Sequence, residues 1–155
     1  MLDIPHFTLS LFTFPFHFPY LYTMKEELIK EKHDIANRAD IELLVNSFYD
    51  KVKTDPTIGF FFTKIIPVDF PAHLPKMYAF WESILFGTSG YKGEPMTAHV
   101  HIHEKHKMEH AHFEKWLSLF TSTVDELFAG PKAEEIKQRS SSIATIMEWK
   151  VVEGK

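Results

Sequence analysis

Histidine is unusually concentrated in one part of this sequence. The segment "GYKGEPMTAHVHIHEKHKMEHAHF", residues 90–113, holds six of the chain's ten histidines. On a helix, His99 and His103 are spaced i, i+4, as are His106 and His110, so each pair would share one face and could clasp zinc or nickel. A catalytic zinc helix usually reads H-E-x-x-H, a string that this sequence lacks. We keep a His-rich divalent-metal-binding helical protein as an alternative.

The other polar side chains that could do chemistry lie at positions where a core is expected. In "DFPAHLPKMYAFW", His73 and Met77 are spaced i, i+4 and Trp81 follows one turn later, so the three share a helix face. Tyr49 lies on the inward side of an earlier helix, and Trp116 falls within a later apolar stripe. An imidazole, a phenol and an indole could thus meet in one aromatic pocket. They could equally be core side chains whose polar tips bond to backbone carbonyls.

The chain has no cysteine. This excludes disulfides, iron–sulfur clusters and thiolate ligation of haem. It also excludes thioether attachment of haem, which needs C-x-x-C-H. Any haem bound here would therefore be held non-covalently.

Composition places the chain among ordinary globular proteins. Its 155 residues are 45% hydrophobic and 25% charged, with a formal net charge of −4, which suits one domain with a core of reasonable size. Because no basic stripe is interleaved with aromatic residues, we expect no nucleic-acid partner.

The elements that would position these residues all read as helices. Apolar side chains recur at helical spacing over residues 40–54, from Pro71 to Gly87, after Pro95, from Phe113 to residue 127 and over residues 136–147. The stretch between the first two helices has room only for a short helical turn. No convincing alternating strand appears. We predict an all-α domain with globin-like crossed helices around a pocket, because a plain four-helix bundle would have simpler turns.

Residues 1–23 differ from the rest, being aromatic and almost uncharged. Pro5, Pro15 and Pro19 argue against a membrane-spanning helix, and the stretch has no basic residue typical of a secretory signal. We interpret residues 1–23 as a flexible or non-native extension and residues 24–155 as one domain. An export or anchoring segment is the minority interpretation.

Four segments together resemble truncated haemoglobins of group III. They are "LLVNSFYDKVKTDPTIGFFF", "HLPKMYAFWESILFG", "GYKGEPMTAH" and "HFEKWLSLFTSTVDELF". Their order and spacing match the family over roughly residues 34–149, and the glycine-pair motifs of other truncated subgroups are missing. The resemblance implies a truncated globin fold, a 2-on-2 helical sandwich.

The resemblance also implies haem b as the cofactor and assigns its iron ligand. The family pattern of Tyr, Gly and Pro followed by His falls on Tyr91, Gly93, Pro95 and His99, so His99 is expected to be the proximal ligand. The other histidines of the segment lie beyond this motif, and we expect four of them simply to be solvated: His101, His103, His106 and His110.

The remaining expected site residues surround the haem. By resemblance, Phe62 packs against the porphyrin, while Phe48 and Met77 supply apolar wall. Tyr49 and Trp116 offer an O–H and an N–H donor to a bound ligand. The cofactor-binding set is therefore Phe48, Tyr49, Phe62, His73, Met77 and Trp116, where His73 is a donor, a sixth ligand or, in our preferred interpretation, a gate.

The expected function is reversible binding of O₂, and of NO, CO or peroxide, by a cytoplasmic monomer without a membrane partner. The sequence does not separate ligand binding from peroxidase or NO dioxygenase chemistry. Since no flavin fingerprint is present, turnover would need an outside reductase. A gas sensor and a metal-free helical interaction module are further alternatives.

Overall fold

A computed structural model describes residues 32–154 and contains six helical elements in that range. They are α2 (Arg38–Thr54), the π-helix η1 (Phe61–Ile65), α3 (Phe70–Phe86), α4 (Pro95–Lys105), α5 (His110–Leu127) and α6 (Pro131–Val152). No strand occurs among these residues, so the all-α prediction is confirmed. The extension predicted over residues 1–23 lies outside the described residues.

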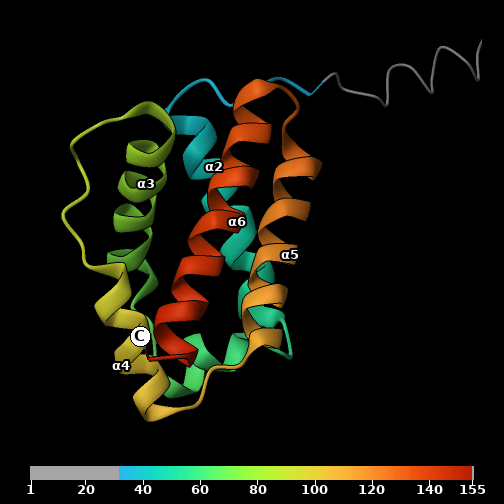
Figure 1. The fold of residues 1–155 in the computed structure, drawn as a ribbon. Coiled ribbons are helices and arrows are strands. Elements are labelled where there is room, and N and C mark those ends of the chain that lie inside the picture. Colours follow the sequence, from blue (N-terminus) through green and yellow to red (C-terminus); the bar gives the residue numbers. More distant parts are fainter. Residues whose placement is uncertain (1–31, 155) are drawn as a thin grey trace, which may run out of the picture. The chain divides into compact units, whose positions relative to one another are not determined.

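The long helices form two stacked pairs. α2 packs against α3, and α5 packs against α6, which runs beside it (Figure 1). Across the stack, α2 contacts α5 and α3 contacts α6. This arrangement is the 2-on-2 sandwich expected from the resemblance. The short helix α4 packs against α6 and η1 and closes one side of the space between the pairs.

Local sequence explains most helix ends. Asn37 caps α2 by accepting from the backbone N–H of Ala39 and Asp40, and the helix stops at Asp55 before Pro56. α3 ends at Gly87, whose φ of 68° is a left-handed conformation that favours glycine. Pro95 opens α4 at a position where a missing N–H is tolerated.

Stacked aromatic rings form the centre of the core. The ring of Phe120 stacks on Trp81 at 4.5 Å and on Trp116 at 5.3 Å, and Phe48 meets it edge-on at 5.3 Å. These contacts join α2, α3 and α5. They therefore fix one wall of the space that α4 and η1 close.

Predicted boundaries differ from the structure at three helices. α6 runs from Pro131 to Val152 and so extends beyond the predicted residues 136–147 at both ends. α5 begins at His110, one turn before the apolar stripe that starts at Phe113, because polar residues fill its solvent-facing first turn. The short turn expected after Pro56 continues into the π-helix η1, a conformation that hydrophobic periodicity does not encode.

Candidate functional site

One large cavity lies between the helices and contains every predicted site residue in its lining. Its volume is about 900 Å³, within the range of small-molecule and cofactor sites. Its walls come from all six elements and the loop before α4. The structure brings the seven predicted residues together around it: Phe48, Tyr49, Phe62, His73, Met77, His99 and Trp116.

Tyr49 and His73 are hydrogen-bonded to each other on one side of this cavity. The Tyr49 Oη lies 2.8 Å from His73 Nε2. When neutral His73 carries its proton on Nδ1, Nε2 accepts the phenol proton, and the other tautomer reverses the bond. Tyr49 is buried among rings, with Phe48 at 5.1 Å and Phe62 at 5.8 Å between centroids.

The surroundings of this pair keep both groups uncharged at neutral pH. Burial raises the pKa of the Tyr49 phenol well above its ordinary value, so Tyr49 retains its proton. Burial also lowers the pKa of His73, and repulsion from the Lys76 ammonium, and from His99 whenever it is protonated, acts in the same direction. A neutral donor pair therefore faces the cavity.

Trp116 provides a second donor at the same wall. Its indole stacks on Phe120 and, at 6.3 Å, on Trp81, which leaves the ring little freedom to move. Within the described residues the indole N–H of Trp116 makes no hydrogen bond. Every fully buried side-chain nitrogen or oxygen in the same range has a hydrogen-bond partner, so the indole nitrogen is not one of them. The Trp116 N–H is therefore an accessible donor on a residue that lines the cavity.

His99 enters the cavity from α4. Its Nδ1 lies 2.7 Å from the carbonyl oxygen of Pro95, one turn earlier. A carbonyl can only accept, so Nδ1 carries the proton and Nε2 keeps its lone pair. Burial lowers the pKa of His99, although the bond to Pro95 opposes that shift. A neutral imidazole with a free Nε2 is the form that binds a metal.

The neighbouring histidines make structural contacts instead of forming a cluster. His101 lies 3.2 Å from Glu104, and the half-buried His103 accepts from the backbone N–H of Met108 at 3.1 Å. The ring of His106 packs edge-on against Phe60. His110 bridges the carboxylates of Glu114 and Glu148, at 3.1 and 2.7 Å.

His101, His106 and His110 are exposed, as the predicted solvation requires, whereas His103 is partly buried. No group of three His, Cys, Asp or Glu side chains able to hold a metal ion occurs in residues 32–154. The described residues give the divalent-metal alternative no support.

Several other cavity residues were not singled out from the sequence. Phe61 of η1, His112 of α5 and Met147 of α6 line it, as do Tyr91 and Lys92 from the loop before α4. Periodicity assigned Met147 only to a core face. Tyr91 belongs to the quoted family motif, which was the one signal that could have flagged its position.

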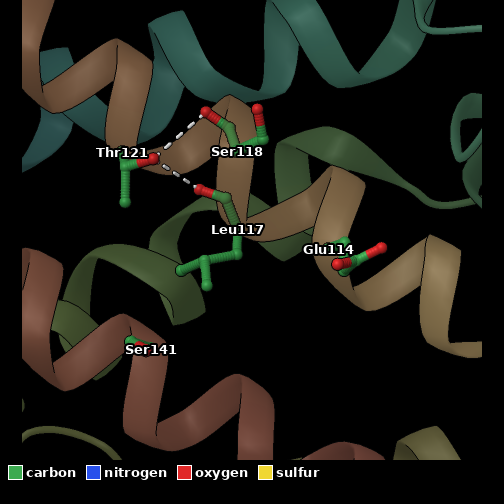
Figure 2. A pocket seen from close by; sticks show the side chains of 5 residues that line it. All are labelled: Glu114, Leu117, Ser118, Thr121 and Ser141. Carbon is green, nitrogen blue, oxygen red and sulfur yellow. Dashed lines mark hydrogen bonds between the residues drawn. The ribbon is translucent and has the colours of Figure 1, made fainter.

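A second hollow on the molecule has no comparable chemistry. It has a volume of about 470 Å³ and lies over α5 and α6 (Figure 2), with Glu114, Leu117, Ser118, Thr121 and Ser141 in its lining. The Thr121 hydroxyl turns back to the carbonyl oxygens of Leu117 and Ser118, at 2.9 and 3.2 Å, as Figure 2 shows. We assign no site there.

Comparison with known proteins identifies the family. A model of the family described as "Bacterial-like globin" matches residues 33–150. This chain belongs to the bacterial-like globins. The match spans all six described elements except the end of α6, so the fold and the cavity residues lie within it.

Individual relatives agree with this family. The group 3 truncated hemoglobin ctb of Campylobacter jejuni is 28% identical over 117 residues, which is 74% of this chain and 90% of that protein. The crystal structure of the group III truncated hemoglobin from Campylobacter jejuni matches with a TM-score of 0.68 and 28% identity, covering 77% of this chain and 94% of that one. The group III resemblance is thereby confirmed.

Another relative matches this chain over only about half of its own length. The group 1 truncated hemoglobin LI410 of Chlamydomonas moewusii is 32% identical over 98 residues, which is 63% of this chain and 54% of that protein.

Among the described residues of this globin, no helix has the length and apolar character needed to cross a bilayer.

Proposed function

We propose that this globin binds haem b non-covalently in the cavity and that His99 is its iron ligand. The observation that carries the proposal is the hydrogen bond from His99 Nδ1 to the Pro95 carbonyl, which leaves Nε2 as a free lone pair in an aromatic cavity of about 900 Å³. The donor set fits the cofactor, because a neutral imidazole ligates haem iron and the apolar walls suit a porphyrin.

The walls of the cavity would hold the porphyrin and keep out water. Phe62 and Met77 are apolar lining residues, and the ring of Phe48 is fixed between Tyr49 and Trp116. A haem held by one protein ligand supplies an iron with an open position for O₂, NO, CO or peroxide. Exclusion of water by these side chains would strengthen every hydrogen bond made there.

Tyr49 and Trp116 would stabilise a ligand that gains negative charge. Both are neutral donors on rings fixed by their neighbours, so little reorganisation is needed when the charge develops. The Tyr49 hydroxyl also bonds His73, which can act as a gate by releasing or retaining that hydroxyl. Two donors favour slow ligand release, which suits NO or peroxide chemistry better than O₂ delivery.

Turnover by such a site would need electrons from outside this domain. We therefore propose that this globin takes electrons from a separate reductase. We also propose that it acts as a monomer in the cytoplasm. The same two donors would assist a reaction with peroxide, since hydrogen bonds to the leaving oxygen help to polarise the O–O bond, and would retain the O₂ that reacts with NO.

Absorption spectra of the full chain titrated with hemin test this proposal. We expect a stoichiometric Soret band and a shifted ferrous–CO band for the unsubstituted chain. His99→Ala should alter both spectra and recover them when free imidazole is added. His110→Ala, which is exposed and lies outside the cavity lining, is the matched control and should leave both unchanged. Failure to take up haem, or spectra insensitive to His99→Ala, would overturn the proposal.

A further inference from the structure

The short segment that joins α4 to α5, residues 106–109, is held by histidine side chains (Figure 1). We call it the α4–α5 connection. The backbone N–H of Met108 donates to Nδ1 of His103 at 3.1 Å, and that of Glu109 donates to Nδ1 of His112 at 2.9 Å. Neither amide has another hydrogen-bond acceptor in residues 32–154. One imidazole from each flanking helix therefore holds the connection.

Both of these hydrogen bonds require a neutral imidazole. A neutral ring has one nitrogen with a lone pair, whereas a protonated ring has none and can only donate. The bond from Met108 places the lone pair of His103 on Nδ1, and Nε2 of the same ring lies 3.3 Å from Nζ of Lys107. Protonation of His103 would therefore turn an N–H toward the Met108 amide and place a second positive charge beside the Lys107 ammonium.

The groups around His112 cannot replace its lone pair. From η1 and the residue before it, the uncharged rings of Phe61 and Phe60 meet the imidazole edge-on, with centroids at 5.0 and 6.1 Å. The side chain of Glu109 is the reciprocal member of a capping box with His112. Its carboxylate would attract a protonated imidazole, but the Glu109 amide would still lose its acceptor.

The connection also contributes to the cavity. Met108 and His112 line it, and the side chain of Met108 packs against a small core cluster of Phe113, Met147 and Val151. The helix just before the connection, α4, has no fully buried residue of its own. Release of the two amides would therefore loosen α4 and open the cavity at this end.

His110, which follows the connection, responds to acid in the opposite sense. It lies 3.1 Å from Glu114 and 2.7 Å from Glu148. The hydrogen bond to Glu148 and the charges of both carboxylates raise the pKa of His110. Protonated His110 thus ties α5 to α6, and it accepts from no backbone amide in residues 32–154. Acid should therefore weaken the connection without weakening this contact.

We propose that the α4–α5 connection is a pH-sensitive latch, closed by neutral His103 and His112 and opened when they take up protons. The two hydrogen bonds are present at high pH and are lost as pH falls through the range in which histidine changes charge, about pH 8 to 5. The latch itself needs no cofactor. Its consequence for His99, the iron ligand carried by α4, rests on the proposed function.

Amide hydrogen exchange of the full chain, measured residue by residue between about pH 8 and 5, tests the latch. Protection factors compare each amide with an unstructured peptide at the same pH, which removes the intrinsic pH dependence of exchange. Those of Met108 and Glu109 should fall about tenfold in acid, the effect of one lost hydrogen bond. The amide of Phe120, in the buried core, should keep its protection.

Asparagine variants separate the lost acceptor from other effects of acid. The side-chain oxygen of asparagine branches from the same carbon as Nδ1 of histidine, accepts a hydrogen bond and does not titrate. His103→Asn should keep the Met108 amide protected at every pH, and His112→Asn should do the same for Glu109. His110→Asn is the matched control and should leave the acid effect at both amides.

Leucine variants remove the acceptor at every pH. His103→Leu should expose the Met108 amide already at neutral pH, and His112→Leu should expose that of Glu109.

Protection that did not change with pH in the unsubstituted chain would overturn the proposal, as would the same acid loss in the asparagine variants. Disappearance of the acid effect in His110→Asn would assign it to His110 and also overturn the proposal. Because exchange is measured without haem, these results leave the proposed function standing. Failure of the chain to take up haem would, conversely, leave the latch standing.

Discussion

At the scale of single residues, the hydroxyl of Tyr49 has two possible acceptors. In the structure it bonds His73 Nε2 at 2.8 Å, and with a ligand in the cavity it would donate to that ligand instead. Its pKa is raised by burial, so Tyr49 remains protonated throughout the neutral range. Its contribution to ligand retention should therefore not depend on its own ionisation.

Tyr49→Phe should accordingly release O₂ about tenfold faster than the unsubstituted globin, the effect of one lost hydrogen bond. The ring and its contacts with Phe48 and Phe62 are kept, so the cavity wall is preserved. Stopped-flow displacement of O₂ by CO measures the rate. Tyr78→Phe, whose hydroxyl bonds Asn46, is the control. An unchanged rate of O₂ release in Tyr49→Phe would show that Tyr49 does not donate a hydrogen bond to the bound ligand.

At Gly59 there is no room for a side chain. A Cβ at this position would lie 2.7 Å from the carbonyl oxygen of Val52 and 3.1 Å from that of Lys53. Both atoms belong to the backbone of α2 and cannot rotate aside. Gly59 thus lets the turn that carries Phe61 and Phe62 approach α2 closely.

Gly59→Ala should lower the free energy of unfolding by about 1–3 kcal/mol, as overpacking typically does. Urea denaturation followed by circular dichroism measures this change. Gly90→Ala, which meets nothing within 4 Å, should change it by less than about 0.5 kcal/mol. If the two variants were equally stable, the close approach of the turn to α2 would not be required by the fold.

At the scale of whole elements, α6 is capped by a residue far away in the sequence. Asp34 accepts from the backbone N–H groups of Lys132 at 2.9 Å and Ala133 at 2.8 Å. The residue at the N-cap position, Gly130, has no side chain with which to cap, and a Cβ there would meet the Asp34 carboxylate carbon at 2.5 Å. Asp34 therefore replaces the usual local cap and joins the segment before α2 to α6.

The pH dependence of this cap has a definite sign. Burial tends to raise the pKa of Asp34, but the backbone donors Lys132, Ala133 and Ile35 outweigh it and hold the pKa below its ordinary 3.8. A carboxylate with a lowered folded-state pKa stabilises the fold above its unfolded pKa, and this contribution is lost as pH falls through the folded value. The cap should thus be fully present at neutral pH.

Asp34→Ala should lower the free energy of unfolding by about 1–2 kcal/mol at pH 7, the usual effect of losing an N-cap. The difference from the unsubstituted chain should shrink as pH falls below 3.8. Denaturant titrations at a series of pH values measure it. Asp50→Ala is the control, because Asp50 is exposed and pairs only with Lys53. A difference that persisted undiminished in acid would contradict a charged cap.

α4 is the element most dependent on what fills the cavity. None of its residues is fully buried, and His99 is only partly covered by the surrounding protein. With 11 residues it is too short to be stable by itself, and its main packing contacts are with α6 and η1. In the absence of the cofactor, α4 should open locally more often than the other helices.

Hydrogen exchange measures this difference directly. Amides of α4 should exchange much faster than those of α5 in the apoprotein and become protected when haem is added. The helices α5 and α6, whose inner faces are buried, serve as internal references and should change little. Equal protection of α4 with and without haem would show that α6 and η1 suffice to order it.

At the scale of the molecule, the sequence predicted the architecture better than the contacts. Apolar spacing located the long helices, and the family motif selected His99 and the residues around it. Neither could reveal that Asp34 caps a helix 98 residues later, because nothing local marks such a pairing. The packing of the Tyr91 ring against Gly93 and the hydrogen bond from Met108 to His103 likewise depend on loop geometry, which periodicity does not report.

The stability of the whole molecule should be linked to haem. A ligand that binds only the folded state stabilises it by mass action, by about 2.7 kcal/mol at a free concentration one hundred times its Kd. Because the cavity touches all six described elements, this gain should appear as a higher midpoint of cooperative unfolding. Hemin should raise the midpoint of the full chain, and His99→Ala should reduce the shift. Zinc ions are the comparison, since no three-ligand cluster occurs among residues 32–154. Stabilisation by zinc and not by hemin would reverse the assignment and make the histidine-rich segment a metal site.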